Sequence, residues 1–210
     1  MPAIGRKEFE QVLRHKVTPD EFEKIMFAYV LAKAAHRGQM RDNGERYFEH
    51  PKSAALILVQ EFGVYDSEMI IAELLHDTVE DTSIFGDRED VFDIRMTNIF
   101  GRRVAELVRA LTKMKQFSEE QERKYALWIV ESADEDVQLL KLADRLHNLR
   151  TIENCDFEKQ RRILEESIAI YLPCAKRIGG IVFEKFYEQC RTLQNQAFLE
   201  LAEKLETATQ

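Results

Sequence analysis

Apolar residues recur along most of this chain at intervals of three and four, which is the spacing of one face of an α-helix. The β-branched residues do not cluster into the alternating runs of a strand, and the chain has only eight glycines and four prolines. One helix start is explicit at Thr18-Pro19-Asp20-Glu21, because Thr18 can cap a helix and Glu21 completes a capping box. The pattern predicts an all-α protein.

Polar segments separate the predicted helices. We expect a short helix in the N-terminal arm of residues 1–17, a polar loop at 38–50 and a second loop at 80–88. The pair Gly179-Gly180 predicts a break before the last helix. The longer helices are expected at about 19–38, 51–62, 67–79, 89–99, 102–114, 119–131, 134–151, 158–178 and 180–206.

One compact helical domain over residues 1–210 is the simplest account, because no internal repeat, low-complexity tract or linker interrupts the pattern. A hydrophobic fraction of 45% and a charged fraction of 32% are ordinary for a folded protein of this length. We expect the core at about 20–180. The C-terminal helix at about 180–206 either completes this core or forms a dimer face. Packing within the chain is the simpler of the two, and a homo-oligomer stays open.

Charge and cysteine content narrow the partners and the compartment. The formal net charge of −8 disfavours nucleic-acid binding, although a metal ion and local cations still allow a small anionic substrate. The longest apolar run, Ala54–Val59, has six residues and the N-terminus lacks an apolar signal region, so no membrane segment is expected. Three widely spaced cysteines without a CxxC pattern predict free thiols and a cytoplasmic location.

The motif LLHDTVEDT at residues 74–82 places four ionisable groups directly after an apolar helix face. His76 and Glu80 are four positions apart, as are Asp77 and Asp81, so each pair shares a face if the helix continues. The His-Asp pair can bind one metal ion, beside which two acids can exchange protons with water or a leaving group. The alternative is a plain helix end that runs into an acidic loop, although acids there oppose the helix dipole.

A second motif, KLADRLHNLRT at residues 141–151, places Asp144 at the edge of a leucine stripe. A carboxylate there is unfavourable unless it binds metal or is paired, and Lys141 or Arg145 can serve as the structural partner. His147 in the same motif is interpreted as a core or surface histidine.

Together the two motifs offer one histidine and two aspartates, a mixed N/O set that suits Mn²⁺, Fe²⁺, Zn²⁺ or Mg²⁺. One more histidine completes a set of four ligands. Both His36 and His50 precede the His-Asp pair, and their spacing does not choose between them.

Four segments, AHRGQMRDNGERYFEHP, LLHDTVEDT, LVRALTK and LLKLADRLHNLRT, resemble the HD-type hydrolase domain of the RelA/SpoT alarmone enzymes in order and spacing. The resemblance covers roughly residues 20–180 and implies an all-α fold of the HD superfamily. It implies hydrolysis of the 3′-pyrophosphate of (p)ppGpp, the nucleotide of the stringent response, with one divalent metal ion, usually Mn²⁺. Long family members add a synthetase domain, for which the residues after 180 leave no room, so a small stand-alone hydrolase is expected.

The resemblance also implies roles for individual residues. The implied metal ligands are His50, His76, Asp77 and Asp144. The implied catalytic acids, Glu80 and Asp81, act on the water or the leaving group. His36 then becomes a loop or pocket residue. Contacts with the nucleotide or its phosphates are implied for Arg41, Lys141, Arg145, Asn148 and Thr151.

One position departs from the family. The usual loop reads Arg-Lys-Ser-Gly, where this chain has Arg41-Asp42-Asn43-Gly44. Like charges at contact distance cost roughly 1 kcal/mol even when they are well screened, so either Asp42 points to solvent or the substrate differs from (p)ppGpp. An adenosine alarmone or the 2′-phosphate of NADPH is the alternative substrate. A nucleotide sensor without catalysis is the alternative function.

Overall fold

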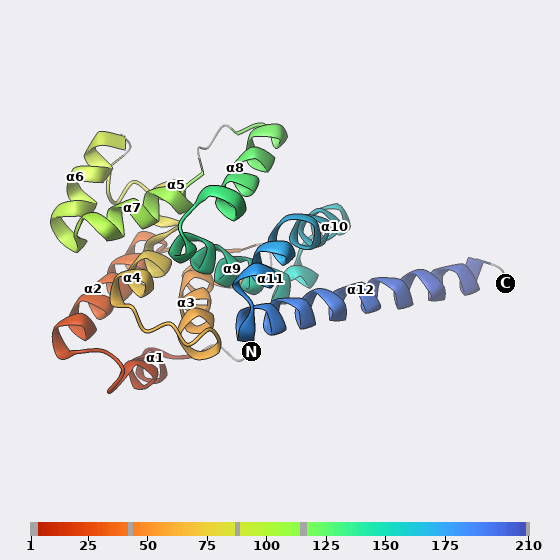
Figure 1. The fold of residues 1–210 in the computed structure, drawn as a ribbon, viewed down its shortest axis with the longest axis horizontal. Helices are drawn as coiled ribbons and strands as arrows, with labels where there is room; N and C mark the ends of the chain where they lie inside the picture. Colours follow the sequence, from red (N-terminus) through yellow and green to blue (C-terminus); the bar gives the residue numbers. More distant parts are fainter. Residues whose placement is uncertain (1–3, 42–43, 87–88, 114–116, 209–210) are drawn as a thin grey trace.

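The protein is helical, as the apolar pattern predicts. The computed structural model describes residues 4–41, 44–86, 89–113 and 117–208, and side chains are described up to 197 except at 89–90. Among these residues the β pairing is limited to an isolated bridge between Met40 and Arg46. The α-helices in Figure 1 are α1 (Arg6–Leu13), α2 (Pro19–Ala35), α3 (Glu49–Leu56), α4 (Ser67–Leu75), α5 (Thr78–Asp81), α6 (Glu89–Phe100), α7 (Arg102–Leu111), α8 (Glu119–Ser132), α9 (Glu135–Arg150), α10 (Phe157–Glu166), α11 (Leu172–Ile178) and α12 (Gly180–Ala208).

Side-chain caps fix several helix starts. At α2 the Thr18 hydroxyl accepts the Glu21 backbone N–H at 3.4 Å, and the Glu21 carboxylate accepts the Thr18 backbone N–H at 2.8 Å. This reciprocal pair is the capping box that the sequence predicts. At α4 the Asp66 carboxylate accepts the Met69 backbone N–H at 3.0 Å. Such caps satisfy amide groups that the first turn of a helix leaves unpaired.

The prediction of one continuous helix at 67–79 is wrong, because α4 ends at Leu75 and α5 begins at Thr78. The Thr78 hydroxyl donates to the Leu75 carbonyl at 2.6 Å and so competes with the backbone for this acceptor. His76 and Asp77 therefore lie in a turn between two helices. The loop expected at 80–88 starts later, since α5 continues to Asp81.

Two other expected helices contain π-helical turns. The helix expected at 51–62 begins at Glu49 and passes into a π-helix at Ile57–Glu61. The helix expected at 158–178 is divided by a second π-helix at Ser167–Tyr171. The predicted break at Gly179 is present, and its φ of 79° is a conformation that glycine adopts readily.

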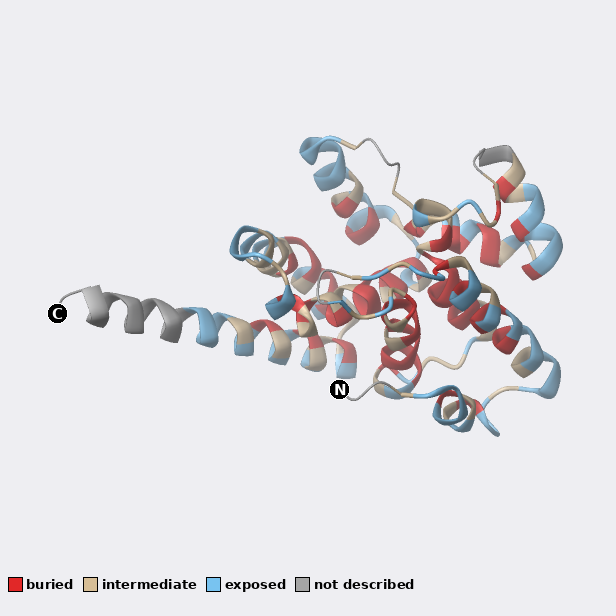
Figure 2. Cartoon of the chain, turned by 180° about the vertical axis from the view of Figure 1, so that it is seen from behind, coloured by how far each residue is buried: buried red, intermediate tan, exposed pale blue. Residues whose placement is uncertain are grey.

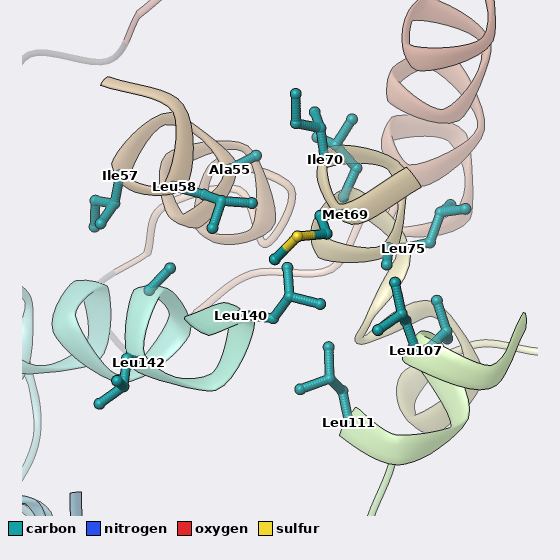
Figure 3. Close-up of a cluster of buried hydrophobic side chains, with 14 of the residues drawn as sticks. Ala55, Ile57, Leu58, Met69, Ile70, Leu75, Leu107, Leu111, Leu140 and Leu142 are labelled. Atoms are coloured by element: carbon teal, nitrogen blue, oxygen red, sulfur yellow. The ribbon is translucent and has the colours of Figure 1, made fainter. Parts of the chain in front are cut away.

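The helix α4 lies at the centre of the hydrophobic core and packs against α2, α3, α7 and α9. Figure 2 shows buried residues concentrated in these central helices. In Figure 3 Met69 of α4 points toward Leu140 of α9, with Leu58 of the π-helix after α3 and Leu111 of α7 beside them. The motifs singled out in the sequence thus lie at or just after the helices with the most packing partners.

The last helix, α12, packs on the rest of the protein through its first turns. Val182, Phe186 and Cys190 are buried, whereas Tyr187 on the same helix is 46% exposed. Figure 1 shows α12 running outward from the other helices. Packing within the chain therefore accounts for the apolar face at the start of α12. Whether the helix also forms a dimer face stays open.

Two expectations from composition concern membranes and thiols. None of the helices in the described part of the chain combines the length and the apolar character that crossing a bilayer requires. The cysteines Cys155, Cys174 and Cys190 are free thiols, as their spacing predicts.

Replacement of Leu140 by Ala tests the packing of α9 on α4. Leu140 is fully buried, and the substitution leaves a cavity beside Met69, so we expect a loss of about 2–5 kcal/mol in the free energy of unfolding. Urea denaturation followed by circular dichroism measures it. The matched control is Ile94→Ala on α6, where Ile94 is 62% exposed and a change below about 0.5 kcal/mol is expected. Equal losses in both variants would contradict this description of the core.

Candidate active site

The four predicted metal ligands lie together where α3, α4 and α9 meet. His50 is on α3, His76 and Asp77 form the turn after α4, and Asp144 is on α9. The ligand atoms of His50, His76 and Asp144 all lie within 4.8 Å of one another. Asp77 joins them, because its Oδ1 lies 3.0 Å from His76 Nε2 and its Oδ2 lies 3.6 Å from His50 Nε2. The helix break described above is what turns two adjacent side chains toward one point.

The orientation of His76 is set by the last turn of α4. Its Nδ1 lies 2.7 Å from the Glu73 carbonyl oxygen, which can only accept, so Nδ1 carries the proton. The opposite atom, Nε2, is buried, has no hydrogen-bond partner among the described residues and faces Asp77. Burial lowers the pKa of His76, but the charges of Asp77, Glu73 and Asp144 outweigh it and raise the pKa to about 10. The surroundings of Nε2 thus favour a positive charge.

His50 is oriented by His147, with which it shares a 2.8 Å contact between the two Nδ1 atoms. Arg41 lies 3.3 Å from the same nitrogen of His147. Because a guanidinium only donates, this nitrogen accepts, and His50 Nδ1–H is the second donor. Burial, together with the charges of His50 and Arg41, lowers the pKa of His147 and keeps it neutral, as an acceptor must be. The Nε2 of His50 is left with a lone pair toward Asp144, at 3.1 Å from Oδ1.

Asp144 is held by two donors from its own helix. Lys141 Nζ lies 2.8 Å from Oδ2, and Asn148 Nδ2 donates to Oδ1 at 2.7 Å. Burial alone would raise the pKa of Asp144, but the ammonium of Lys141 holds it well below its usual range. Asp144 is therefore a carboxylate, and Arg41 extends the chain of contacts by donating to Asn148 Oδ1 at 2.8 Å.

Asp77 is held by a tyrosine from the loop before α3. The Tyr47 hydroxyl donates to Asp77 Oδ2 at 3.1 Å, and the Tyr47 ring stacks on His36 with centroids 4.7 Å apart. His36 also contacts Gln39 Oε1 through Nδ1 at 2.7 Å. The structure thus places His50 in the cluster and His36 behind Tyr47. Of the two histidines that spacing leaves as candidates for the first ligand, the geometry favours His50.

The cluster suits a divalent transition-metal ion. Two imidazole nitrogens and two carboxylates form a mixed donor set, and the histidine tautomers leave both Nε2 atoms directed into the cluster. The bonds from the far ring nitrogens to Glu73 and His147 are the kind that orient histidines at metal sites. The role of these four residues as ligands stays a prediction that this geometry supports.

The two predicted catalytic acids have different surroundings. Glu80 is partly buried, and its Oε2 accepts the Lys113 backbone N–H at 3.1 Å. Burial and the nearby charges of Asp77 and Asp81 raise the pKa of Glu80, although Lys113 opposes them. Asp81 is exposed. The raised pKa makes Glu80 better suited than an ordinary carboxylate to exchange protons near neutral pH.

A cleft of about 680 Å³ opens over the cluster, a volume typical of small-molecule sites. Its lining includes the four clustered residues, both acids and all five residues implied in nucleotide contacts. Of the five, Lys141 is buried against Asp144, and Arg145 is held by Glu166 and Ser167 and lies over the Tyr171 ring. Asp42, the residue that departs from the family loop, lies outside the described residues.

Three residues of the site were missed by the sequence patterns. Tyr47 had no assigned role, and His147 was interpreted as a plain core or surface histidine. A signal for His147 exists, because it follows Asp144 by three positions on a helix and therefore shares its face. Glu73, fully buried one turn before His76, was hidden within an apolar helix.

Replacement of His50 and of His36 by Ala tests the assignment of the first ligand. We expect His50→Ala to abolish high-affinity Mn²⁺ binding, because it removes one of four donor groups. His36→Ala should bind Mn²⁺ far better than His50→Ala, since His36 stacks behind Tyr47 and lies outside the cluster. Isothermal titration of the metal-stripped proteins measures both affinities. The reverse order of affinities would show that the first ligand is His36.

The chain is similar to a known domain family and to several curated proteins. The family described as HD domain matches residues 28–181. The bifunctional (p)ppGpp synthase/hydrolase SpoT of Escherichia coli K12 is 36% identical over 182 residues, which are 82% of this chain and 24% of that protein. The guanosine-3′,5′-bis(diphosphate) 3′-pyrophosphohydrolase of Aquifex aeolicus is 41% identical over 176 residues, with the same coverages of 82% and 24%. The chain thus spans about a quarter of the length of these curated relatives.

The fold has a counterpart among solved structures. A metazoan ortholog of SpoT, described as hydrolysing ppGpp, superimposes with a TM-score of 0.70 over 80% of this chain and 94% of that one. The two sequences are 24% identical, so the likeness concerns the fold. With the HD domain match over most of its length and a His-Asp pair in its central cluster, the chain belongs to the HD domain family.

Proposed function

We propose that the protein hydrolyses the 3′-pyrophosphate of (p)ppGpp, giving GDP or GTP and pyrophosphate, with one divalent metal ion. His50, His76, Asp77 and Asp144 would hold this ion, and Mn²⁺ is the ion we propose. The observation that carries the proposal is the buried His/Asp cluster at the floor of a cleft. Relatives 36–41% identical to this chain carry the names (p)ppGpp synthase/hydrolase and 3′-pyrophosphohydrolase, which supports the same substrate.

The cleft contains cations that can contact the phosphates of a nucleotide, although eight acidic side chains also line it and the chain has a net charge of −8. Arg41, Lys113, Arg123 and Arg162 line the cleft and come from four separate parts of the chain. Cations at a cleft concentrate the field on an anionic ligand even when the whole protein is acidic. Asn148 and Thr151 add neutral hydrogen-bonding groups to the same wall, where a base or a ribose would be recognised.

The reaction exchanges one P–O bond for another. A water oxygen bonds to the phosphorus attached to the ribose 3′ oxygen, the bond to the 3′ oxygen breaks, and pyrophosphate leaves. The metal ion, when bound, supplies positive charge that polarises the water or a phosphate oxygen. Glu80 takes up a proton from the water, because its raised pKa makes it a usable base near neutral pH. The 3′ oxygen gains a proton, which Asp81 at the edge of the cleft can deliver.

The substrate is tested with a panel of ppGpp, an adenosine alarmone and NADPH, each with the Mn²⁺-loaded protein. We expect pyrophosphate release from ppGpp at the highest kcat/KM. Preferred phosphate release from NADPH, or preferred hydrolysis of the adenosine nucleotide, would replace (p)ppGpp as the substrate. Binding of ppGpp by the metal-loaded protein without hydrolysis of any nucleotide would favour the sensor function instead.

Replacement of Glu80 by Gln tests its role in proton transfer. Because Gln keeps the shape and loses the proton-accepting group, we expect kcat for ppGpp to fall by about 10²–10⁴-fold with little change in KM. Steady-state kinetics and Mn²⁺ titration measure the loss and show that the metal site is intact. Glu106→Gln on α7 is the matched control, because Glu106 is exposed and pairs with Arg102 on its own helix, away from the cleft. A kcat that stays within threefold in Glu80→Gln would remove Glu80 from the mechanism.

A further inference from the structure

A buried carboxyl group beside the cluster has no role in the function proposed above. Glu73 on α4 is fully buried, and neither of its carboxyl oxygens has a hydrogen-bond partner among the described residues. A buried carboxylate without donors or a cation is strongly unfavourable. A group that destabilises the fold in this way needs a compensating charge nearby.

The position of Glu73 connects it to the cluster. It lies on the last turn of α4, and its backbone carbonyl accepts the hydrogen bond from His76 Nδ1 at 2.7 Å. It also follows Met69 by one turn, and Met69 points toward α9. The charge of Glu73 raises the pKa of His76. In turn, Asp144 of α9 raises the pKa of Glu73 and Lys141 lowers it. Its buried carboxyl group is therefore near enough to the predicted ligands for its charge to act on them.

The charges of the site balance only when Glu73 is counted. Asp77 and Asp144 carry two negative charges, and the ammonium of Lys141, 2.8 Å from Asp144, cancels one of them. Histidines give up their extra proton when they bind a metal ion, so a divalent cation would leave this set with a net charge of plus one. An ionised Glu73 makes the set neutral. Since uncompensated charge is unfavourable in a buried site, the cation and the Glu73 carboxylate stabilise each other.

We propose that Glu73 is a third carboxylate of the metal centre, which raises the affinity for a divalent cation through its charge. The proposal rests on the metal site of the proposed function. Glu73 does not belong to the group whose ligand atoms lie within 4.8 Å of one another, so its role is electrostatic and not that of a direct ligand. In the metal-free protein burial raises the pKa of Glu73 to about 8, and the unpaired carboxyl group destabilises the fold.

The test is Mn²⁺ titration and thermal unfolding of the metal-stripped full chain and its Glu73→Gln variant. We expect Glu73→Gln to bind Mn²⁺ about 10- to 100-fold more weakly, the range seen when groups behind metal ligands are replaced. Without metal, the variant should unfold at a higher temperature than the unchanged protein. Saturating Mn²⁺ should raise the Tm of the variant by less than it raises the Tm of the unchanged protein. Glu73→Asp keeps the charge and should recover most of the affinity.

The control is Glu61→Gln, which removes a carboxylate paired with Arg150 at 2.5 and 2.8 Å away from the cleft. It should lower the Tm and leave the Mn²⁺ affinity unchanged. If the unchanged protein does not bind Mn²⁺, the metal site of the proposed function fails and this inference with it. If it binds Mn²⁺ and Glu73→Gln binds equally well, only the role of Glu73 is refuted. Glu73→Met is the second variant, and failure of both variants to fold without metal would also refute it.

Discussion

A carboxylate buried as deeply as that of Asp144 is stable only when cations and hydrogen-bond donors surround it. Lys141 and Asn148, one turn before and one turn after it on α9, provide these partners within 2.8 Å. Lys141 and Asn148 together fix which carboxylate oxygen of Asp144 faces His50 across the contact with α3. The geometry of the site thus depends on the ion pair between Lys141 and Asp144. The apolar contacts between α4 and α9 hold this ion pair away from water.

The histidines are oriented by a second layer of contacts that carries no net charge. The Glu73 carbonyl and the neutral ring of His147 each accept a hydrogen bond from a clustered histidine, so that both Nε2 atoms face inward. Arg41 joins this layer to the cleft through His147 and Asn148. An anionic nucleotide that attracts Arg41 would therefore act on the same hydrogen-bond chain that fixes the ligands.

Local patterns predicted the fold better than they predicted the site. Apolar periodicity and caps such as Thr18 gave the helices, because both depend on residues within one or two turns. The break before α5 was not predicted, because it depends on a single hydrogen bond from the Thr78 hydroxyl to a backbone carbonyl oxygen. The roles of Tyr47 and His147 arise from contacts across 30 and 97 residues of sequence, which spacing alone does not reveal. Motif spacing found the ligand candidates, and the family resemblance favoured His50 over His36, which the packing of α3 supports.

The cluster draws its members from three helices that are distant in sequence. A cation bound there would link them as a non-covalent cross-link and close two long loops of the chain at once. Separation of α9 from α3 or α4 would then require release of the ion, so the three helices would open as one cooperative unit. In amide hydrogen exchange, the backbone amides of these helices would share a single opening free energy that rises with the metal concentration, while those of the outer turns of α12 would exchange independently of it.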